Sequence, residues 1–193
     1  MKYKNESENL ASLSLYVKEA IALRDVIEDR WFSSLIDFAR RKETIRVKLK
    51  GLGYVNLPWE EYRVLAYQIA NLKKCKNKID YIDIINYFKN ENSKNQNYIY
   101  KAIHLLKILG NLCYKGLSPT INDDVLSFNF NGQNLKFGLN CSTWTLIHVY
   151  AIGEYNYPEI LSNLKEKDVV DIGANIGDSS IYFAVFGAKK LLV

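Results

Sequence analysis

The sequence has little cysteine, histidine, proline or methionine, and it has no long apolar run. Its three cysteines, Cys75, Cys113 and Cys141, are too few and too widely spaced for a disulfide framework or a zinc site. We therefore expect them to be small buried thiols. The two histidines, His104 and His148, share no metal-ligand spacing with the cysteines, so no metal is predicted.

No window approaches the roughly 18–20 uninterrupted apolar residues of a membrane span. The polar start, MKYKNESENL, lacks the apolar stretch of a secretory signal peptide. The hydrophobic fraction of 48% and the charged fraction of 24% are those of an ordinary globular protein. These features predict a cytoplasmic protein with no membrane span.

Positive charge is concentrated in the first part of the chain. Residues 1–110 carry 20 Lys and Arg against 13 Asp and Glu, whereas residues 111–193 carry 6 against 8. The basic runs RRKETIRVKLK and KKCKNK can meet phosphates, but such runs are more often solvated helix ends and edge strands. They lack interleaved aromatic residues and any recognised nucleic-acid motif, so we do not expect nucleic-acid binding.

Hydrophobic periodicity predicts a mostly helical first part. Apolar residues at three- and four-residue steps indicate one helix from about Leu10 to Arg41. Alternation over Thr44–Lys50 predicts a strand, which Gly51-Leu52-Gly53 turns back into a partner at 54–57. Pro58 then suits the first turn of a further helix. The expected buried face of that helix consists of Tyr62, Leu65, Ala66, Ile69 and Leu72.

Two more helices and a hairpin follow in the sequence. A short helix is expected over Asp80–Phe88, then a polar loop over residues 89–97 and an amphipathic helix over Tyr98–Cys113. Two alternating stretches, Leu126–Phe130 and Leu135–Leu139, flank Asn-Gly, the favoured pair for a tight hairpin turn. The intervening Gln-Asn pair is expected to lengthen or bulge that turn. Residues 141–164 indicate helix or loop.

The predicted organisation is a helical region over residues 1–120, with its hairpin near 44–57, and the start of a second domain over 121–193. The stretch VVDIGANIGDSSIYFAVFGAKKLLV, which begins at Val169, has the order strand, glycine turn, helix and strand. Its first apolar run fits a parallel strand that is buried on both faces. Asp178 begins the helix and Gly187 ends it.

Each residue of the turn has a physical role. Gly173 lets the backbone leave the strand sharply and leaves room for a ligand. Asn175 is a non-glycine residue that tolerates the left-handed conformation. Gly177 allows helix and strand to pack closely, and Asp171 can accept hydrogen bonds from loop amides or from a ligand's ammonium group. In open α/β sheets ligands bind at this carboxyl edge.

The spacing narrows the choice of cofactor. A P-loop is excluded, because no GK[ST] follows the turn, and the segment G-A-N-I-G-D does not match the dinucleotide pattern G-x-G-x-x-G. An acid two positions before the first glycine fits better with the D-x-G-x-x-x-G pattern of S-adenosylmethionine-dependent methyltransferases, whose loop receives the methionine part of the cofactor.

The stretch VVDIGANIGDSSIYFAVFGAKK resembles motif I of the FkbM-type methyltransferase family. The resemblance implies a class I, Rossmann-like α/β fold, S-adenosylmethionine as methyl donor, and a small-molecule or glycan acceptor that receives the methyl on oxygen. It implies the following cofactor-binding residues: Asp171, Gly173, Ala174, Asn175, Gly177, Asp178 and Ser179. Tyr155, in a Glu-Tyr pair before the motif, is a weaker candidate.

The family places a ribose-binding acid at the end of its second strand, which falls about two residues beyond Val193. We therefore expect a methyltransferase domain that is incomplete at its C-terminus and inactive alone, with catalytic residues and acceptor unidentified. One alternative is a non-catalytic binding or interaction module, with a partner chain completing the sheet. Another is a basic helical module that contacts nucleic acid.

Overall fold

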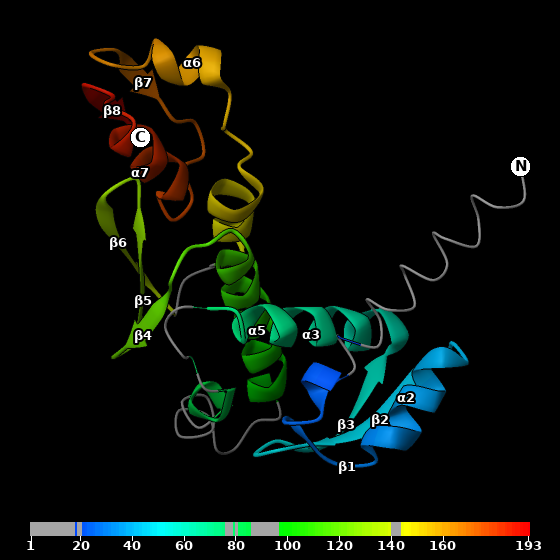
Figure 1. The fold of residues 1–193 in the computed structure, drawn as a ribbon. Helices are drawn as coiled ribbons and strands as arrows, with labels where there is room; N and C mark the ends of the chain where they lie inside the picture. Colours follow the sequence, from blue (N-terminus) through cyan, green and yellow to red (C-terminus); the bar gives the residue numbers. More distant parts are fainter. Residues whose placement is uncertain (1–17, 19–20, 76–78, 80, 86–96, 140–143) are drawn as a thin grey trace, which may run out of the picture. The chain divides into compact units, whose positions relative to one another are not determined.

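The computed structural model describes residue 18 and residues 21–75, 79, 81–85, 97–139 and 144–193. It shows a mixed α/β protein built from small sheets and helices (Figure 1). The chain divides into two compact units, residues 1–110 and 111–193, each of which is described by itself. The division falls inside one helix, and the domain boundary at residue 120 stays a prediction.

The first unit contains a three-stranded antiparallel sheet of β1 (Ile27–Asp29), β2 (Thr44–Leu49) and β3 (Gly53–Pro58). Strands β2 and β3 form the predicted hairpin, in register from Thr44 with Pro58 to Leu49 with Gly53. The alternation behind that prediction is confirmed, because Ile45, Val47 and Leu49 are fully buried while the residues between them are more exposed.

The prediction of one continuous helix from Leu10 to Arg41 is wrong: residues 18, 21–23 and 31–39 are helical, but residues 24–30 are not, and residues 10–17 and 19–20 lie outside the described residues. Residues 24–26 form a turn, Ile27 pairs with Leu49 across β1 and β2, and the next helix, α2, spans only Trp31–Ala39. Arg30, which precedes α2, has a left-handed φ of 66°, so the helix cannot run through it. Of the apolar residues behind that prediction, Ile27 is buried on strand β1 instead.

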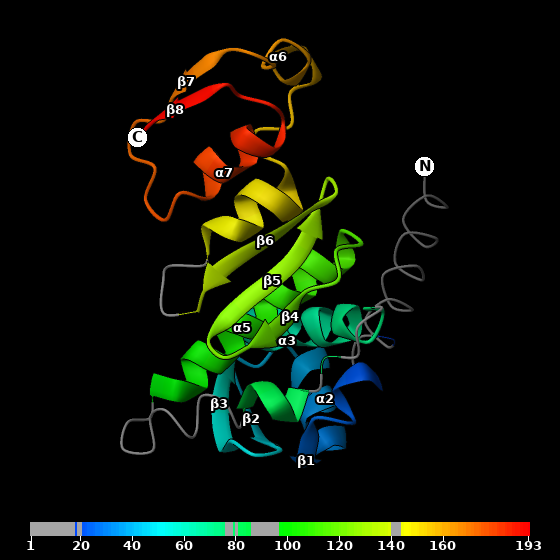
Figure 2. The ribbon, with the colours of Figure 1, turned by 90° about the vertical axis from the view of Figure 1, so that its left-hand side faces the viewer.

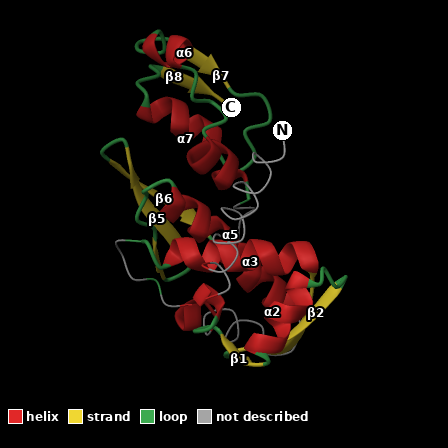
Figure 3. Ribbon diagram, turned by 45° about the vertical axis from the view of Figure 1, so that its right-hand side comes forward, coloured by secondary structure: helices red, strands yellow, loops and turns green. Residues whose placement is uncertain are grey.

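Helices α2 and α3 (Trp59–Leu72) pack on this sheet (Figure 3). Pro58 directly precedes α3 and the predicted face is buried, which confirms both expectations for this helix. Phe38 of α2 stacks on Trp59 of α3 with ring centroids 5.0 Å apart, and Trp59 Nε1 donates a hydrogen bond to the Phe38 carbonyl over 2.9 Å. This pair fixes the two helices to each other.

Helix α5 (Asn97–Tyr114) confirms the amphipathic helix predicted over Tyr98–Cys113. Lys107 on α5 forms an ion pair of 2.6 Å with Glu61 on α3. Gly110 allows the two helices to approach, because a Cβ added there would lie 2.8 Å from the carbonyl oxygen of Gln68. Residues 81–85 are helical as predicted, whereas the ends of that expected helix and residues 89–96 of the predicted polar loop lie outside the described residues. Asn97, predicted as the end of that loop, instead begins α5.

The second unit contains the antiparallel sheet of β4 (Thr120–Asn122), β5 (Val125–Phe130) and β6 (Gln133–Gly138), shown in Figure 2. The hairpin is confirmed, with Asn131 and Gly132 in the turn at φ of 49° and 80°. The Gln133-Asn134 pair does not lengthen the turn, because both residues pair directly with β5. Strand β4 was not predicted.

The π-helix η1 (Ile147–Ile152) and the short α6 (Pro158–Ser162) lead to the parallel pair of β7 (Asp168–Val170) and β8 (Lys190–Leu192). Helix α7 (Asp178–Val185) joins the two strands, so the predicted β-α-β order is present. Gly187, at φ of 95°, follows the end of α7 and confirms the predicted stop.

Cys75 and Cys113 are buried, as predicted, but both are disulfide-bonded, so the prediction of free thiols is wrong for them. Cys141 lies outside the described residues. Disulfides persist mainly in oxidising compartments, so this state weighs against a cytoplasmic location, which stays a prediction. Among the described helices, none combines the length and the apolar character that crossing a membrane requires.

Candidate cofactor-binding loop

The candidate site is the loop between β7 and α7, residues 171–177. Asp171 follows the last residue of β7, and its backbone N–H donates to the carbonyl of Leu192 over 2.8 Å, which extends the parallel ladder by one bond. The loop therefore leaves the carboxyl end of a parallel strand, the edge at which α/β sheets bind ligands. A helix of eight residues begins directly after it.

The loop backbone alternates in handedness. Gly173, Asn175 and Gly177 have positive φ angles of 82°, 50° and 78°, whereas the residues between them do not. The left-handed conformation expected of Asn175 is confirmed. A turn closes within the loop, because the Gly177 N–H donates to the Ala174 carbonyl over 2.7 Å. Such alternation turns neighbouring N–H groups toward one side, which is how backbone segments bind anions.

Gly173 agrees with its predicted role, whereas Gly177 does not. A Cβ added at Gly173 or at Gly177 would meet no described atom within 4 Å. The open space at Gly173 agrees with a ligand-facing position. At Gly177 this open space shows that the predicted close packing of helix on strand is wrong. Glycine is favoured there for another reason, because the residue that precedes α7 has a positive φ.

Asp171 is held in place by two serines of α7. Ser179 Oγ donates a hydrogen bond of 2.7 Å and Ser180 Oγ one of 2.6 Å, and both reach the same carboxylate oxygen, Oδ2. Neither bond uses Oδ1, so the half-buried carboxylate keeps one oxygen for a ligand. Ser179 was among the predicted site residues. Ser180 was missed, although it immediately follows Ser179 in the first turn of the same helix.

Asp178 is placed differently from Asp171. It is only 3% exposed, and its Oδ2 has no hydrogen-bond partner among the described residues. Its backbone carbonyl accepts a hydrogen bond of 2.9 Å from the Tyr150 hydroxyl. A carboxylate in the first turn of a helix is stabilised by the helix dipole. Asp178 is therefore buried inside the unit, whereas the half-buried carboxylate of Asp171 lies at the start of the loop.

The remaining predicted residues also gather at this loop. Ala174 is buried, and Tyr155 contacts the rings of Tyr182 and Phe183 on α7, with centroids 6.1 and 5.2 Å away. Burial raises the pKa of the Tyr155 hydroxyl, and the negative charges of Glu154, Asp171 and Asp178 raise it further. The ring contacts place Tyr155 beside α7, the helix that follows the loop.

Strand β7 is not buried on both faces, so that prediction is wrong in this structure. Val170 is 64% exposed and Ile172 is 93% exposed, and Leu192 and Val193 beside them are also exposed. The reason is the small size of the sheet, which contains only β7 and β8 among the described residues. The apolar side chains at the carboxyl ends of these two strands are therefore exposed.

The described residues contain no group of three or more His, Cys, Asp and Glu side chains that could hold a metal ion. No protein family, curated protein or solved structure matches the chain. The geometry of the loop offers one carboxylate oxygen for a cation and a backbone concavity for an anion. A ligand that carries both charges on neighbouring atoms fits this arrangement.

Proposed function

We propose that the loop over residues 171–177 binds the methionine part of S-adenosylmethionine and that the chain contains the first cofactor-binding unit of an FkbM-type methyltransferase. The observation that carries the proposal is the fixed carboxylate of Asp171, which Ser179 and Ser180 hold at the carboxyl end of a parallel strand. The motif D-I-G-A-N-I-G-D is the reason for choosing this cofactor among the zwitterionic ligands.

The residues of the loop fit the amino-acid end of that cofactor. The free oxygen of Asp171 would accept a hydrogen bond from the ammonium group. The N–H groups around Gly173 and Asn175 would face the carboxylate, and Gly173 leaves the space that the ligand needs. When bound, the cofactor supplies a methyl group on a sulfonium centre. The chain's contribution is to bind and orient it. By the family resemblance the acceptor is a hydroxyl of a sugar or small metabolite.

The test compares two ligands that differ at the amino-acid end. S-adenosylmethionine carries that end, and 5′-methylthioadenosine lacks it. In an NMR titration of the chain we expect S-adenosylmethionine to shift the amides of residues 171–180 with a Kd of about 1 mM, and methylthioadenosine to leave them unchanged. Such weak affinity follows because the described loop contacts only one end of the cofactor.

The variant Asp171→Asn keeps a carbonyl oxygen for the two serines and removes the charge. It should abolish the difference between the two ligands, whereas the matched control Asp168→Asn, on the same strand and exposed, should preserve it. Equal shifts with both ligands in the unaltered chain would contradict the proposal. Thermal unfolding of both variants checks that the fold is kept.

A second candidate function is a non-catalytic interaction module, and one observation favours it. Val170, Ile172, Leu192 and Val193 expose apolar side chains at the end of a sheet of two strands, where another chain could add strands. Light scattering over a range of protein concentrations tests this function. A concentration-dependent association that Ile172→Asp removes would support it, and a monomer at every concentration would count against self-association.

A further inference from the structure

The second unit contains a cavity of about 380 Å³ that is separate from the loop over residues 171–177. Its walls come from β5, the π-helix η1 and α7, together with the start of the unit at Lys115. None of the loop residues lines it. Its volume lies within the range of small-molecule sites, and π-helical turns are frequent at functional sites.

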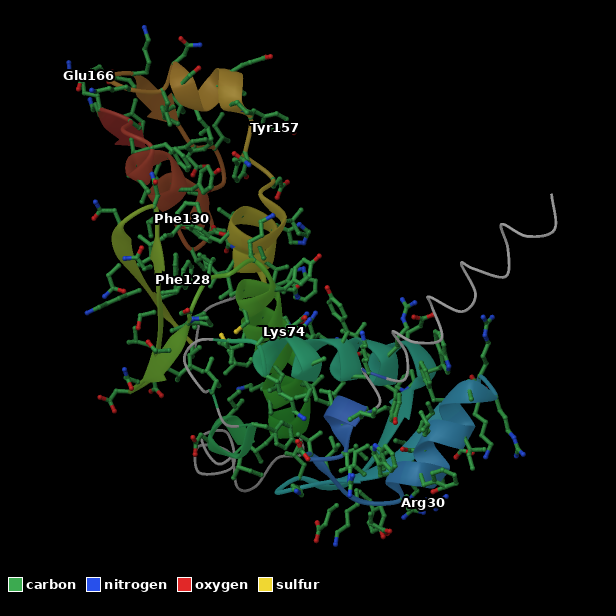
Figure 4. The ribbon with its side chains drawn as sticks, viewed as in Figure 1. Arg30, Lys74, Phe128, Phe130, Tyr157 and Glu166 are labelled. Atoms are coloured by element: carbon green, nitrogen blue, oxygen red, sulfur yellow. The ribbon has the colours of Figure 1, made fainter. Side chains whose placement is uncertain are left out.

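Four aromatic residues line the cavity, namely Phe130, Tyr150, Tyr182 and Phe186. Phe130 contacts the rings of Tyr150, Tyr182 and Phe186, with centroids 5.0, 5.5 and 6.0 Å away. Figure 4 shows Phe130 on β5. Tyr150 and Tyr182 are buried, whereas Phe130 and Phe186 are partly exposed. A flat ligand can therefore rest against Phe130 and Phe186, with the two tyrosines behind them.

The polar residues that line the cavity include one charged side chain, the ammonium of Lys115. Lys115 is the only charged residue that lines the cavity, and Asn131 and Asn156 add side-chain amides. Lys115 is exposed, and among the described residues it has no carboxylate within 4.0 Å. One unneutralised ammonium beside aromatic rings attracts a ligand with one negative charge. A phosphate dianion would leave half of its charge without a partner.

We propose that this cavity binds a small aromatic carboxylate. The ring lies against Phe130 and Phe186, the carboxylate meets the Lys115 ammonium, and the amides of Asn131 and Asn156 reach polar substituents on the ring. Size supports this ligand class, since a cavity of about 150 Å³ already holds benzene. A cavity of about 380 Å³ accommodates one substituted ring or two fused rings together with a carboxylate. The proposal does not depend on the binding of S-adenosylmethionine.

The cavity also touches the start of α7. Tyr150, which lines the cavity, donates its hydroxyl hydrogen to the carbonyl of Asp178 at the first position of α7. The wall of the cavity is therefore joined by one hydrogen bond to the residue that follows the candidate cofactor loop. This contact gives the experiment a reporter, because the amide of Ser179 should shift together with the amides of Gly153 and Asn156.

The experiment is an NMR titration with 2-naphthoate, with 2-naphthalenemethanol as an uncharged probe and cyclohexanecarboxylate as a non-aromatic one. We expect naphthoate to bind with a Kd below about 1 mM and both other probes to bind at least about fivefold more weakly. Lys115→Gln should weaken naphthoate binding about tenfold. The matched control Lys136→Gln, an exposed lysine of β6 outside the cavity wall, should leave it unchanged.

Three results would overturn the proposal. They are an absence of shifts at about 10 mM naphthoate, equal affinity for the charged and uncharged aromatic probes, and equal losses in Lys115→Gln and Lys136→Gln. Asp171→Asn should leave naphthoate binding intact, so failure here is distinguishable from failure of the cofactor proposal. Unfolding curves of the two lysine variants establish that both remain folded.

Discussion

The hydroxyl of Tyr150 donates a hydrogen bond of 2.9 Å to the backbone carbonyl of Asp178. This bond joins the π-helix η1 to the first residue of α7, and both residues are buried. Burial raises the pKa of the Tyr150 hydroxyl, and the nearby charge of Asp178 raises it further, so the group remains a neutral donor throughout the ordinary pH range. The candidate loop thus depends on a contact with an element far from it in sequence.

We expect Tyr150→Phe to destabilise the protein by about 1–2 kcal/mol, because it leaves the buried carbonyl of Asp178 without its donor. The measurement is the free energy of unfolding in urea. Tyr157→Phe is the matched control, since Tyr157 is 58% exposed, and this change should have little effect. Equal stabilities for the two variants would show that the buried bond contributes nothing.

Gly110→Ala should also destabilise the protein, by about 1–3 kcal/mol. Alanine favours a helix over glycine by about 1 kcal/mol, so the helix alone predicts the opposite sign. The steric clash should outweigh this helix preference, because the added Cβ would lie 2.8 Å from both the Cβ and the backbone oxygen of Gln68. Lys101→Ala, at an exposed position of the same helix, is the control and should be nearly neutral. A stabilised Gly110→Ala variant would contradict the close approach of α3 and α5.

Substitutions at Asn175 should separate backbone conformation from side-chain chemistry. With φ at 50°, Asn175→Gly should be tolerated, whereas Asn175→Val should lose about 1–2 kcal/mol, because a β-branched residue is strained in the left-handed region. Chemical denaturation of both variants measures the difference. Asn134→Val supplies the control on strand β6, where a β-branched residue is favoured. Equal stabilities of the two Asn175 variants would argue against the left-handed turn.

The pH dependence of stability should include a contribution from His104. Burial lowers the pKa of its imidazole from the ordinary value of 6.5, and the charge of Lys107 lowers it further. The unfolded chain therefore binds more protons than the folded one below pH 6.5. Stability is then fully present above that pH and declines as the pH falls from 6.5 through the lowered pKa.

Unfolding curves at several pH values between about 5 and 8 test this contribution. His104→Gln should reduce the loss of stability on acidification. The same measurement on His148→Gln, at the other histidine of the chain, serves as the comparison. An unchanged pH profile in His104→Gln would remove the imidazole as the cause. A loss of stability that persists in both variants would come from other groups, such as the carboxylates, which titrate at lower pH.

The elements predicted correctly from the sequence are those whose hydrophobic periodicity and bounding turn residues indicate the same helix or strand. The hairpin over residues 44–58, helices α3 and α5, and the β5–β6 hairpin all have alternating or helical patterns bounded by Gly, Pro or Asn-Gly. Each combines a local signal with a buried face, and each is confirmed. The long helix failed because spacing alone cannot reveal that Ile27 pairs with Leu49, and the left-handed Arg30 has no strong signature in the sequence.

The backbone conformation of the candidate loop was partly predictable from the sequence, whereas most of its contacts were not. The left-handed Asn175 follows from residue type and was foreseen. The bond from Ser180 to Asp171 depends on how the first turn of α7 faces the strand end, and the bond to the Asp178 carbonyl comes from Tyr150 on a different element. The exposure of Val170 and Ile172 reflects the number of neighbouring strands, which the apolar run itself does not specify.

The difference between the two kinds of strand pairing has a consequence for the order of folding. Strands β5 and β6 are joined by two residues, Asn131 and Gly132, so little loop entropy opposes their pairing, and hairpins form within about 1–10 μs. Strands β7 and β8 meet only after α7 and its flanking turns bring their ends together. During refolding, the amides of the hairpin should therefore gain protection from hydrogen exchange before the parallel pair, and the candidate loop should be among the last segments to take shape.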